Sequence, residues 1–202
     1  SGQWREDKFH GAGTCSYGPR DLPDSYVGEW RDGVRHGQGT LTYGAGGHYV
    51  GGWADDLCEG EGVLTNAAGD VYEGVFEKGY LVGDGVCHYH LGGEYTGLFR
   101  GGLRTGFGKM TYHCRDVYDG KWFRDDRCGH GVCTYIAGHV YDGSWKADKR
   151  DGHGEFRAKQ GDVYVGQWKC DVRCGSGQQK YADGTEYDGE FKDDVRHGQG
   201  EF

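Results

Sequence analysis

A tyrosine recurs every 23 residues along most of the chain, and this period constrains the fold more than any other feature of the sequence. Each of these tyrosines opens the phrase Tyr-x-Gly-x-Trp/Phe, and a Gly-x-Gly pair begins nine residues after the glycine of that phrase. The eight tyrosines are Tyr26, Tyr49, Tyr72, Tyr95, Tyr118, Tyr141, Tyr164 and Tyr187. A period of this length predicts a stacked array of repeats rather than one globular core.

A ninth copy stands at the start as Gly2, Trp4, Gly11 and Gly13, 26 residues ahead of its successor. The extra length lies in 18–25, which holds both prolines of the chain and predicts an enlarged surface turn. We expect one continuous array over 1–202, with copies starting near 1, 26, 49, 72, 95, 118, 141, 164 and 187. Both ends cut through a copy, so we expect a fragment of a longer array, because arrays need polar end caps.

Within each copy the residues alternate as they do in a β-strand. In 118–122, Tyr118 and Trp122 share one face with the glycine between them, while Asp119 and Lys121 point the other way. The second phrase, 129–135, alternates in the same manner. The segment 123–128 between them predicts a short polar loop, and glycine turns separate most copies. Each copy is therefore predicted to be one β-hairpin followed by a turn.

The glycines next to the aromatic residues are expected to let the rings lie flat on the backbone and to allow the sheet to bend. A lone hairpin is marginally stable, so each copy must pack on its neighbours. The predicted fold is all-β: an elongated, twisted single-layer rod of about nine consecutive antiparallel hairpins. Its structural core is predicted to contain the aromatic residue that closes each first phrase, at Trp30, Trp53, Phe76, Phe99, Trp122, Trp145, Trp168 and Phe191.

Composition limits the classes of partner. A formal net charge of −9 argues against nucleic acid as a partner and against simple adsorption to an anionic membrane. No apolar run reaches the roughly 20 residues that span a bilayer. The eight cysteines follow the 23-residue period instead of forming a dense disulfide framework, and Cys15, Cys87 and Cys133 occupy an apolar core slot. A reducing cytoplasm is the expected location.

The unit Tyr-x-Gly-x-Trp-x-x-Gly-x-x-x-Gly-x-Gly, clearest at 26–39, resembles the MORN (membrane occupation and recognition nexus) repeat. The resemblance covers essentially the whole chain, and a long array of this kind is most similar to the cytoskeletal MORN scaffolds of parasitic protists. It implies β-hairpin rods that form antiparallel homodimers, filaments or meshes, contact other cytoskeletal proteins, and lie in the cytoplasm peripheral to membranes. Some such scaffolds are bridged by zinc.

A stripe of arginines occupies one slot just ahead of the Gly-x-Gly pair. Its members are Arg35, Arg104, Arg127, Arg150, Arg173 and Arg196. Neighbouring copies would place them about 10 Å apart along one edge, where guanidinium groups suit phosphate or carboxylate. A phosphoinositide headgroup or an acidic partner could therefore bind there. The alternative is local neutralisation, because the same loops carry many aspartates.

A second candidate site contains thiols and imidazoles. Cys128 and His130 lie two residues apart on the outward face of a strand, and His153 and Cys174 hold matching slots in the next two copies. Zinc takes four N or S ligands at 2.0–2.3 Å, and Cys128 and Cys174 lie roughly 20 Å apart by strand spacing, so one chain cannot close a site with both. Two chains related by a two-fold axis could supply Cys₂His₂. The alternative is surface Cys and His without metal.

The aromatic row has its own alternative, a groove for acyl chains lined by ring edges. Signals for catalysis are weak: the sequence has no Gly-x-Ser-x-Gly, no phosphate loop and no His-Glu-x-x-His. We therefore expect a non-catalytic scaffold that requires no cofactor, and zinc is the candidate metal. The alternatives are a phosphoinositide-binding module and a regulatory array within a larger enzyme.

Overall fold

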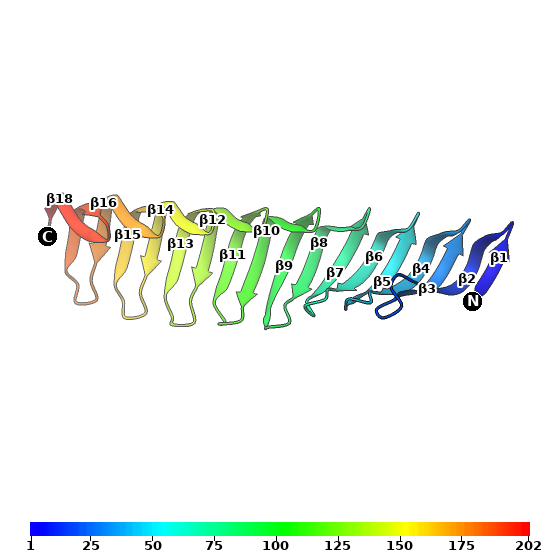
Figure 1. The fold of residues 1–202 in the computed structure, drawn as a ribbon. Helices are drawn as coiled ribbons and strands as arrows, with labels where there is room; N and C mark the ends of the chain where they lie inside the picture. The colour runs from blue at the N-terminus through cyan, green and yellow to red at the C-terminus, as the bar shows by residue number, and fades with distance from the viewer. The chain divides into compact units, whose positions relative to one another are not determined.

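The computed structural model describes residues 1–202 and contains only β-strands, turns and bends. The chain divides into two units, Ser1–Leu103 and Arg104–Phe202. In each unit every strand pairs antiparallel with the strand that follows it in the sequence (Figure 1). The prediction of an all-β fold of consecutive hairpins is confirmed, and one continuous array over 1–202 stays a prediction.

The strands have similar lengths throughout. The strands that lie entirely in the first unit are β1 (Gly2–Arg5), β2 (Lys8–Tyr17), β3 (Asp24–Arg31), β4 (Val34–Thr42), β5 (His48–Ala54), β6 (Leu57–Thr65), β7 (Val71–Glu77), β8 (Tyr80–His88) and β9 (Gly93–Arg100). The others are β10 (Leu103–Tyr112), β11 (Val117–Phe123), β12 (Asp126–Thr134), β13 (Val140–Lys146), β14 (Lys149–Arg157), β15 (Val163–Lys169), β16 (Val172–Lys180), β17 (Glu186–Lys192) and β18 (Val195–Glu201). The structure contains no helix that is long and apolar enough to cross a bilayer.

The connection inside each hairpin is shorter than the sequence predicted. β11 ends at Phe123 and β12 begins at Asp126, so only Arg124 and Asp125 form the turn where we expected a loop over 123–128. Both residues have positive φ, 52° and 71°, as a two-residue type I′ turn requires. Because aspartate tolerates this left-handed region better than most residues, a charged dipeptide can make a turn that usually needs glycine.

The hairpins β3–β4, β5–β6, β7–β8, β11–β12, β13–β14, β15–β16 and β17–β18 each contain a bulge beside the Gly-x-Gly pair. Between β11 and β12, Gly120 pairs with Gly131 but the next pair is Lys121 with Cys128, which leaves two residues of β12 without a partner on β11. Those two residues pair with β13 instead. Since the insertion has two residues, the alternation of inward and outward side chains is preserved, and the faces predicted from parity hold.

The two glycines of each pair have different roles. At Gly62 an added Cβ would lie 2.3 Å from the hydroxyl and 2.6 Å from the ring of Tyr49, so this glycine makes room for the ring. At Gly60 an added Cβ would meet nothing within 4 Å, but φ is +79° at the bulge. The second glycine of the pair therefore accommodates the aromatic ring, and the first supplies the bend.

The core is a row of aromatic rings on the inward face. Tyr26 is fully buried, and its ring packs edge-to-face on Trp30 of its own copy and on Trp53 of the next, with centroids 5.1 and 5.3 Å apart. The indole Nε1 of Trp53 donates to the carbonyl of Gly39 in the preceding copy. All eight residues of the predicted aromatic core keep at most 8% of their surface exposed. Each ring therefore joins two copies.

Candidate functional site

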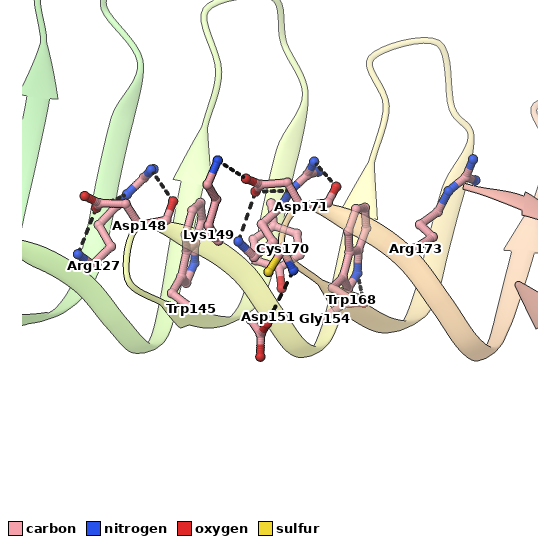
Figure 2. Close-up of polar contacts among 12 residues, drawn as sticks. Arg127, Trp145, Asp148, Lys149, Asp151, Gly154, Trp168, Cys170, Asp171 and Arg173 are labelled. Carbon is pink, nitrogen blue, oxygen red and sulfur yellow. Dashed lines mark hydrogen bonds and ion pairs between the residues drawn. The ribbon is translucent and has the colours of Figure 1, made fainter. Parts of the chain in front are cut away.

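The arginine stripe lies at the junctions between copies, where five of its six side chains are bonded to the turn of the next hairpin. The Nε–H of Arg127 donates to Oδ1 of Asp148 at 3.0 Å, and its Nη2 donates to the Asp148 main-chain carbonyl at 2.7 Å (Figure 2). In return Asp148 Oδ1 accepts the main-chain N–H of Arg127, and the Asp148 N–H donates to the Arg127 carbonyl. We call this four-bonded unit an arginine clamp.

The same clamp recurs with nearly constant geometry. The five clamps are Arg35–Asp56, Arg104–Asp125, Arg127–Asp148, Arg150–Asp171 and Arg173–Asp194, with Nε to Oδ1 distances of 2.9–3.2 Å. Their arginine side chains keep only 18–28% of their surface exposed. Charge-assisted bonds of this kind are the stronger class of hydrogen bond, so the clamps join neighbouring hairpins by more than ring contacts.

Each clamping guanidinium also lies against the aromatic ring of the next copy. The Cζ atom of Arg127 is 4.2 Å from the centroid of Trp145 (Figure 2). The Cζ atom of Arg150 is likewise 4.2 Å from the centroid of Trp168. A planar guanidinium can stack on a ring while its edge donates to a carboxylate, which an ammonium group cannot do. The five clamping guanidinium groups are thus bonded to aspartate along one edge and lie against a ring on one face, and the choice between a binding stripe and local neutralisation stays a prediction.

The clamp has an apolar counterpart in three copies. Where the arginine slot holds Phe9, Cys58 or Leu81, the facing turn residue is Gly33, Gly79 or Gly102. The main-chain bond is kept in each case, as from Gly79 N–H to the Cys58 carbonyl at 2.9 Å. The chain therefore exchanges arginine and aspartate together for an apolar residue and glycine.

This pairing was missed from the sequence, although the signal is present there. Asp56 follows Arg35 by 21 residues, and the same interval joins the other clamps and two of their apolar counterparts. Comparing the identity of residues across copies at that interval would have revealed it. Arg196 has no following turn within the chain, and its Cζ lies 5.4 Å from the Tyr187 ring and 5.0 Å from the Phe202 ring.

The candidate zinc ligands face outward but do not converge within one chain. His130 Nε2 lies 3.0 Å from Asp142 Oδ1, and Cys128 is half-buried opposite Lys121. His153 pairs with Gln167 across the sheet, and Cys174 also faces Gln167 from the other side. No group of three or more His, Cys, Asp or Glu side chains is placed to hold a metal ion. A zinc site made from these residues would need ligands from a second chain.

Burial raises the pKa of tyrosine hydroxyl and cysteine thiol groups in the sheet. Desolvation raises the pKa of Tyr26 to about 12 and that of Cys58 to about 11. The Tyr26 hydroxyl therefore stays protonated and donates to the Glu29 carbonyl at 3.0 Å. Burial also raises the pKa of the Cys128 thiol, with Lys121 opposing that shift. None of these groups is prepared for nucleophilic chemistry, which requires a lowered pKa.

One buried polar side chain was not foreseen. Gln179 occupies the slot where other copies have apolar residues, and it is only 6% exposed. Its Oε1 accepts from Arg173 Nη1 at 2.9 Å, and its Nε2 donates to the Val163 and Lys180 carbonyls. Because every polar atom has a partner, the residue is a satisfied part of the core. It borders a hollow of about 440 Å³ between the Arg150 and Arg173 clamps.

With 23-residue hairpins stacked through rings and clamps, the chain is a structural repeat protein, and its repeats match a known family model. The MORN repeat model matches residues 1–21, 26–48, 49–71, 95–113, 118–140, 141–163, 164–186 and 187–202. The chain therefore belongs to the MORN repeat family, which is a repeat family and not an enzyme family. The copy at 72–94 lies outside the matched segments, yet it forms β7 and β8 like the others.

Comparison with other proteins adds little beyond the repeat itself. No curated protein matches the chain. Among solved structures, the wild-type TCP10 domain of Danio rerio CPAP in complex with a peptide of Danio rerio STIL has a TM-score of 0.49 at 10% identity, covering 88% of this chain and 84% of that one. The SAS-4 (dCPAP) TCP domain of Drosophila melanogaster with a proline-rich motif of Ana2 (dSTIL) has a TM-score of 0.44 at 13% identity, covering 77% and 85%. With values this low, neither likeness carries a conclusion about function.

Proposed function

We propose that this protein is a non-catalytic scaffold that self-associates into antiparallel homodimers and larger assemblies at a membrane-linked cytoskeletal structure in the cytoplasm. The observation that carries the proposal is the difference between the two faces of each hairpin. Inward slots repeat the same rings and every junction keeps its main-chain bond, whereas outward slots change from copy to copy. A repeat fold whose inward face is constant and whose outward face varies suits a protein that holds partners at set intervals.

The dimer is proposed to form through the later copies. Cys128 and His130 from one chain supply half of a tetrahedral ligand set, and a two-fold axis brings the same pair from the other chain. His130 would exchange its contact with Asp142 for the metal, or keep it as an orienting partner through the second ring nitrogen. His153 and Cys174 hold the same slots in the next copies and would act in the same way if the axis lay further along.

The test is the oligomeric state of the chain with and without the ligand pair. Size-exclusion chromatography with light scattering should give a dimer for the natural chain, and elemental analysis should find zinc at about one ion per dimer. Cys128→Ser with His130→Ala should shift the mass toward a monomer and remove the zinc. His113→Ala with Cys114→Ser is the matched control, because it removes the same two residue types from an exposed turn between copies. A natural chain that stays monomeric at all concentrations would refute the proposal, and an unchanged dimer without zinc would refute the bridge.

Phosphoinositide binding through the arginine stripe has less support. The Nε and one Nη of five arginines already donate to aspartate, and headgroup binding would have to replace those bonds. We expect the chain not to float with vesicles containing phosphatidylinositol bisphosphate at physiological salt. Flotation that is lost when Arg127, Arg150 and Arg173 are replaced would favour the lipid-binding alternative. A regulatory role beside an enzyme domain would show in the full-length sequence.

A further inference from the structure

The outward face of β5 to β9 is apolar over several adjoining strands. Its side chains are Val50, Val63, Val75, Val82, Val86 and Leu98, which we call the apolar face. Val50 pairs directly with Val63, and Val75 pairs with Val82. Val50, Val75 and Leu98 remain 44%, 41% and 39% exposed. Exposed apolar side chains gathered on one side of a sheet are a feature of interaction sites.

The repeat fold does not demand apolar residues in these slots. The slot of Val75 holds Lys121, Ser144 and Gln167 in later copies, and the slot of Val86 holds Lys109 and Glu155. Those copies build the same hairpins with the same register. The valines of the apolar face are therefore not explained by folding alone.

The apolar face also carries carboxylates that have no ion-pair partner. Glu73 lies between Val63 and Val86 across two strand pairs, Glu61 pairs with Val75, and Asp84 pairs with Leu98. All three are exposed, and none of them takes part in an ion pair. Ser1–Leu103 as a whole has seven Lys and Arg against fifteen Asp and Glu, a net charge of −8. Arg104–Phe202 has sixteen against seventeen, a net charge of −1.

Three classes of occupant are disfavoured by this arrangement. Strand addition is blocked, because β5 to β8 are each paired on both sides. A second copy placed by a two-fold axis at the centre of the face would set Glu73 against Glu73, which costs free energy. An anionic membrane would be repelled by the same carboxylates.

We propose that the apolar face binds an amphipathic helix of a partner protein, with leucine-like side chains on the valines and Lys or Arg residues facing Glu61, Glu73 and Asp84. A helix laid on one face of a sheet is a standard two-layer arrangement, and it would bury the apolar side chains that the single layer leaves open. The carboxylates then give the complex its charge preference, because opposite charges across an interface steer and select the partner.

The proposal is tested with two designed 18-residue helical peptides that share a leucine face and carry either lysines or glutamates on the polar face. Fluorescence anisotropy should show binding of the lysine peptide at tens of micromolar and at least about tenfold weaker binding of the glutamate peptide, which corresponds to about 1.4 kcal/mol. Amide NMR shifts should fall on β5 to β9. Val75→Lys with Val86→Lys should weaken the lysine peptide at least about tenfold, and these changes should fold normally because Lys121 and Lys109 occupy the same slots.

Charge reversal supplies the matched control. Glu73→Lys should reverse the preference between the two peptides, whereas Asp119→Lys, in the same slot of a later copy, should leave both affinities within about twofold. Equal effects of these two variants would mean that the peptides sense only net charge, and the proposal would fall. It would also fall if Val75→Lys abolished dimerisation or vesicle flotation instead of peptide binding, since the occupant would then be a second copy or a membrane.

Discussion

The two units build one repeat with different chemistry. Arg104–Phe202 joins its copies through four arginine clamps and presents a mixed polar outward face, with nearly balanced charge. Ser1–Leu103 has one clamp, fills three equivalent junctions with Phe9, Cys58 and Leu81, and carries the apolar face. What both units share is the ring row, the bulge glycine and the main-chain bond at each junction. The rings, the bulge glycine and the main-chain bonds, which we call the shared set, therefore make the fold. The junction side chains and the outward residues can differ between the units without changing it.

The largest effect should come from the shared set, and it should be the same in both units. Gly62→Ala and Gly131→Ala each place a Cβ 2.3–2.4 Å from a tyrosine hydroxyl, and overpacking of this kind should cost about 3 kcal/mol of unfolding free energy. Gly60→Ala is the control, because its Cβ has room and only its positive φ costs about 1 kcal/mol. Urea denaturation measures all three. A clear difference between Gly62→Ala and Gly131→Ala would break the claim of a common frame.

Removing one clamp partner should have the next largest effect. Asp171→Gly leaves the guanidinium of Arg150 partly buried without its carboxylate, so we expect a loss of about 2 kcal/mol. Adding Arg150→Leu recreates the Leu81 and Gly102 junction and should recover about half of that loss. A double-mutant cycle with Arg150→Leu alone gives the coupling energy from urea denaturation. Strict additivity would show that arginine and aspartate are exchanged together for no energetic reason.

The reverse exchange should install a clamp in the first unit. Cys58→Arg alone places a charge at a half-buried slot opposite Trp53 and should destabilise the fold by about 1 kcal/mol. Gly79→Asp should restore most of this, because aspartates in the same turn position adopt positive φ at Asp56 and Asp125. Gly79→Asp by itself is the control for the turn. If the double variant were no more stable than Cys58→Arg, the junctions of the two units would not be interchangeable.

The smallest effect concerns pH. Burial raises the pKa of Asp171, but the main-chain N–H of Arg150 and the side chains of Lys149 and Arg150 outweigh it, so the folded pKa lies below the usual value. A lowered folded pKa contributes stability above the unfolded pKa of about 3.9, and this contribution is lost as pH falls through the folded pKa. Below about pH 4 the natural chain should therefore lose more stability than Arg150→Leu with Asp171→Gly, by less than 1 kcal/mol. Parallel pH profiles of the two proteins in urea would contradict this.

Much of the fold was predictable from a single sequence, because the same pattern recurs in every copy. The 23-residue tyrosine, the alternation in 118–122 and the Gly-x-Gly pair predicted hairpins, the inward face and the aromatic core. The loop over 123–128 was predicted too long, because aspartate and arginine in the left-handed region are not recognisable as a two-residue turn from residue type. The bulge was also missed, since an insertion of two residues leaves the alternation unchanged.

The candidate sites were located less well, for a physical reason. Residue types placed Arg127 and Arg150 in a stripe, but not the aspartate of the next copy that bonds each of them. The positions of Cys128 and His130 on an outward face followed from parity, and the zinc bridge stays a prediction because its remaining ligands would belong to another chain. The period is read along the chain and the parity within a single strand, so the sequence alone determined the repeat, its hairpins and which residues face inward. The junctions, and with them which charges are bonded and which stay open to a partner, depend on turns of one copy meeting strands of another, and only the tertiary structure decided those.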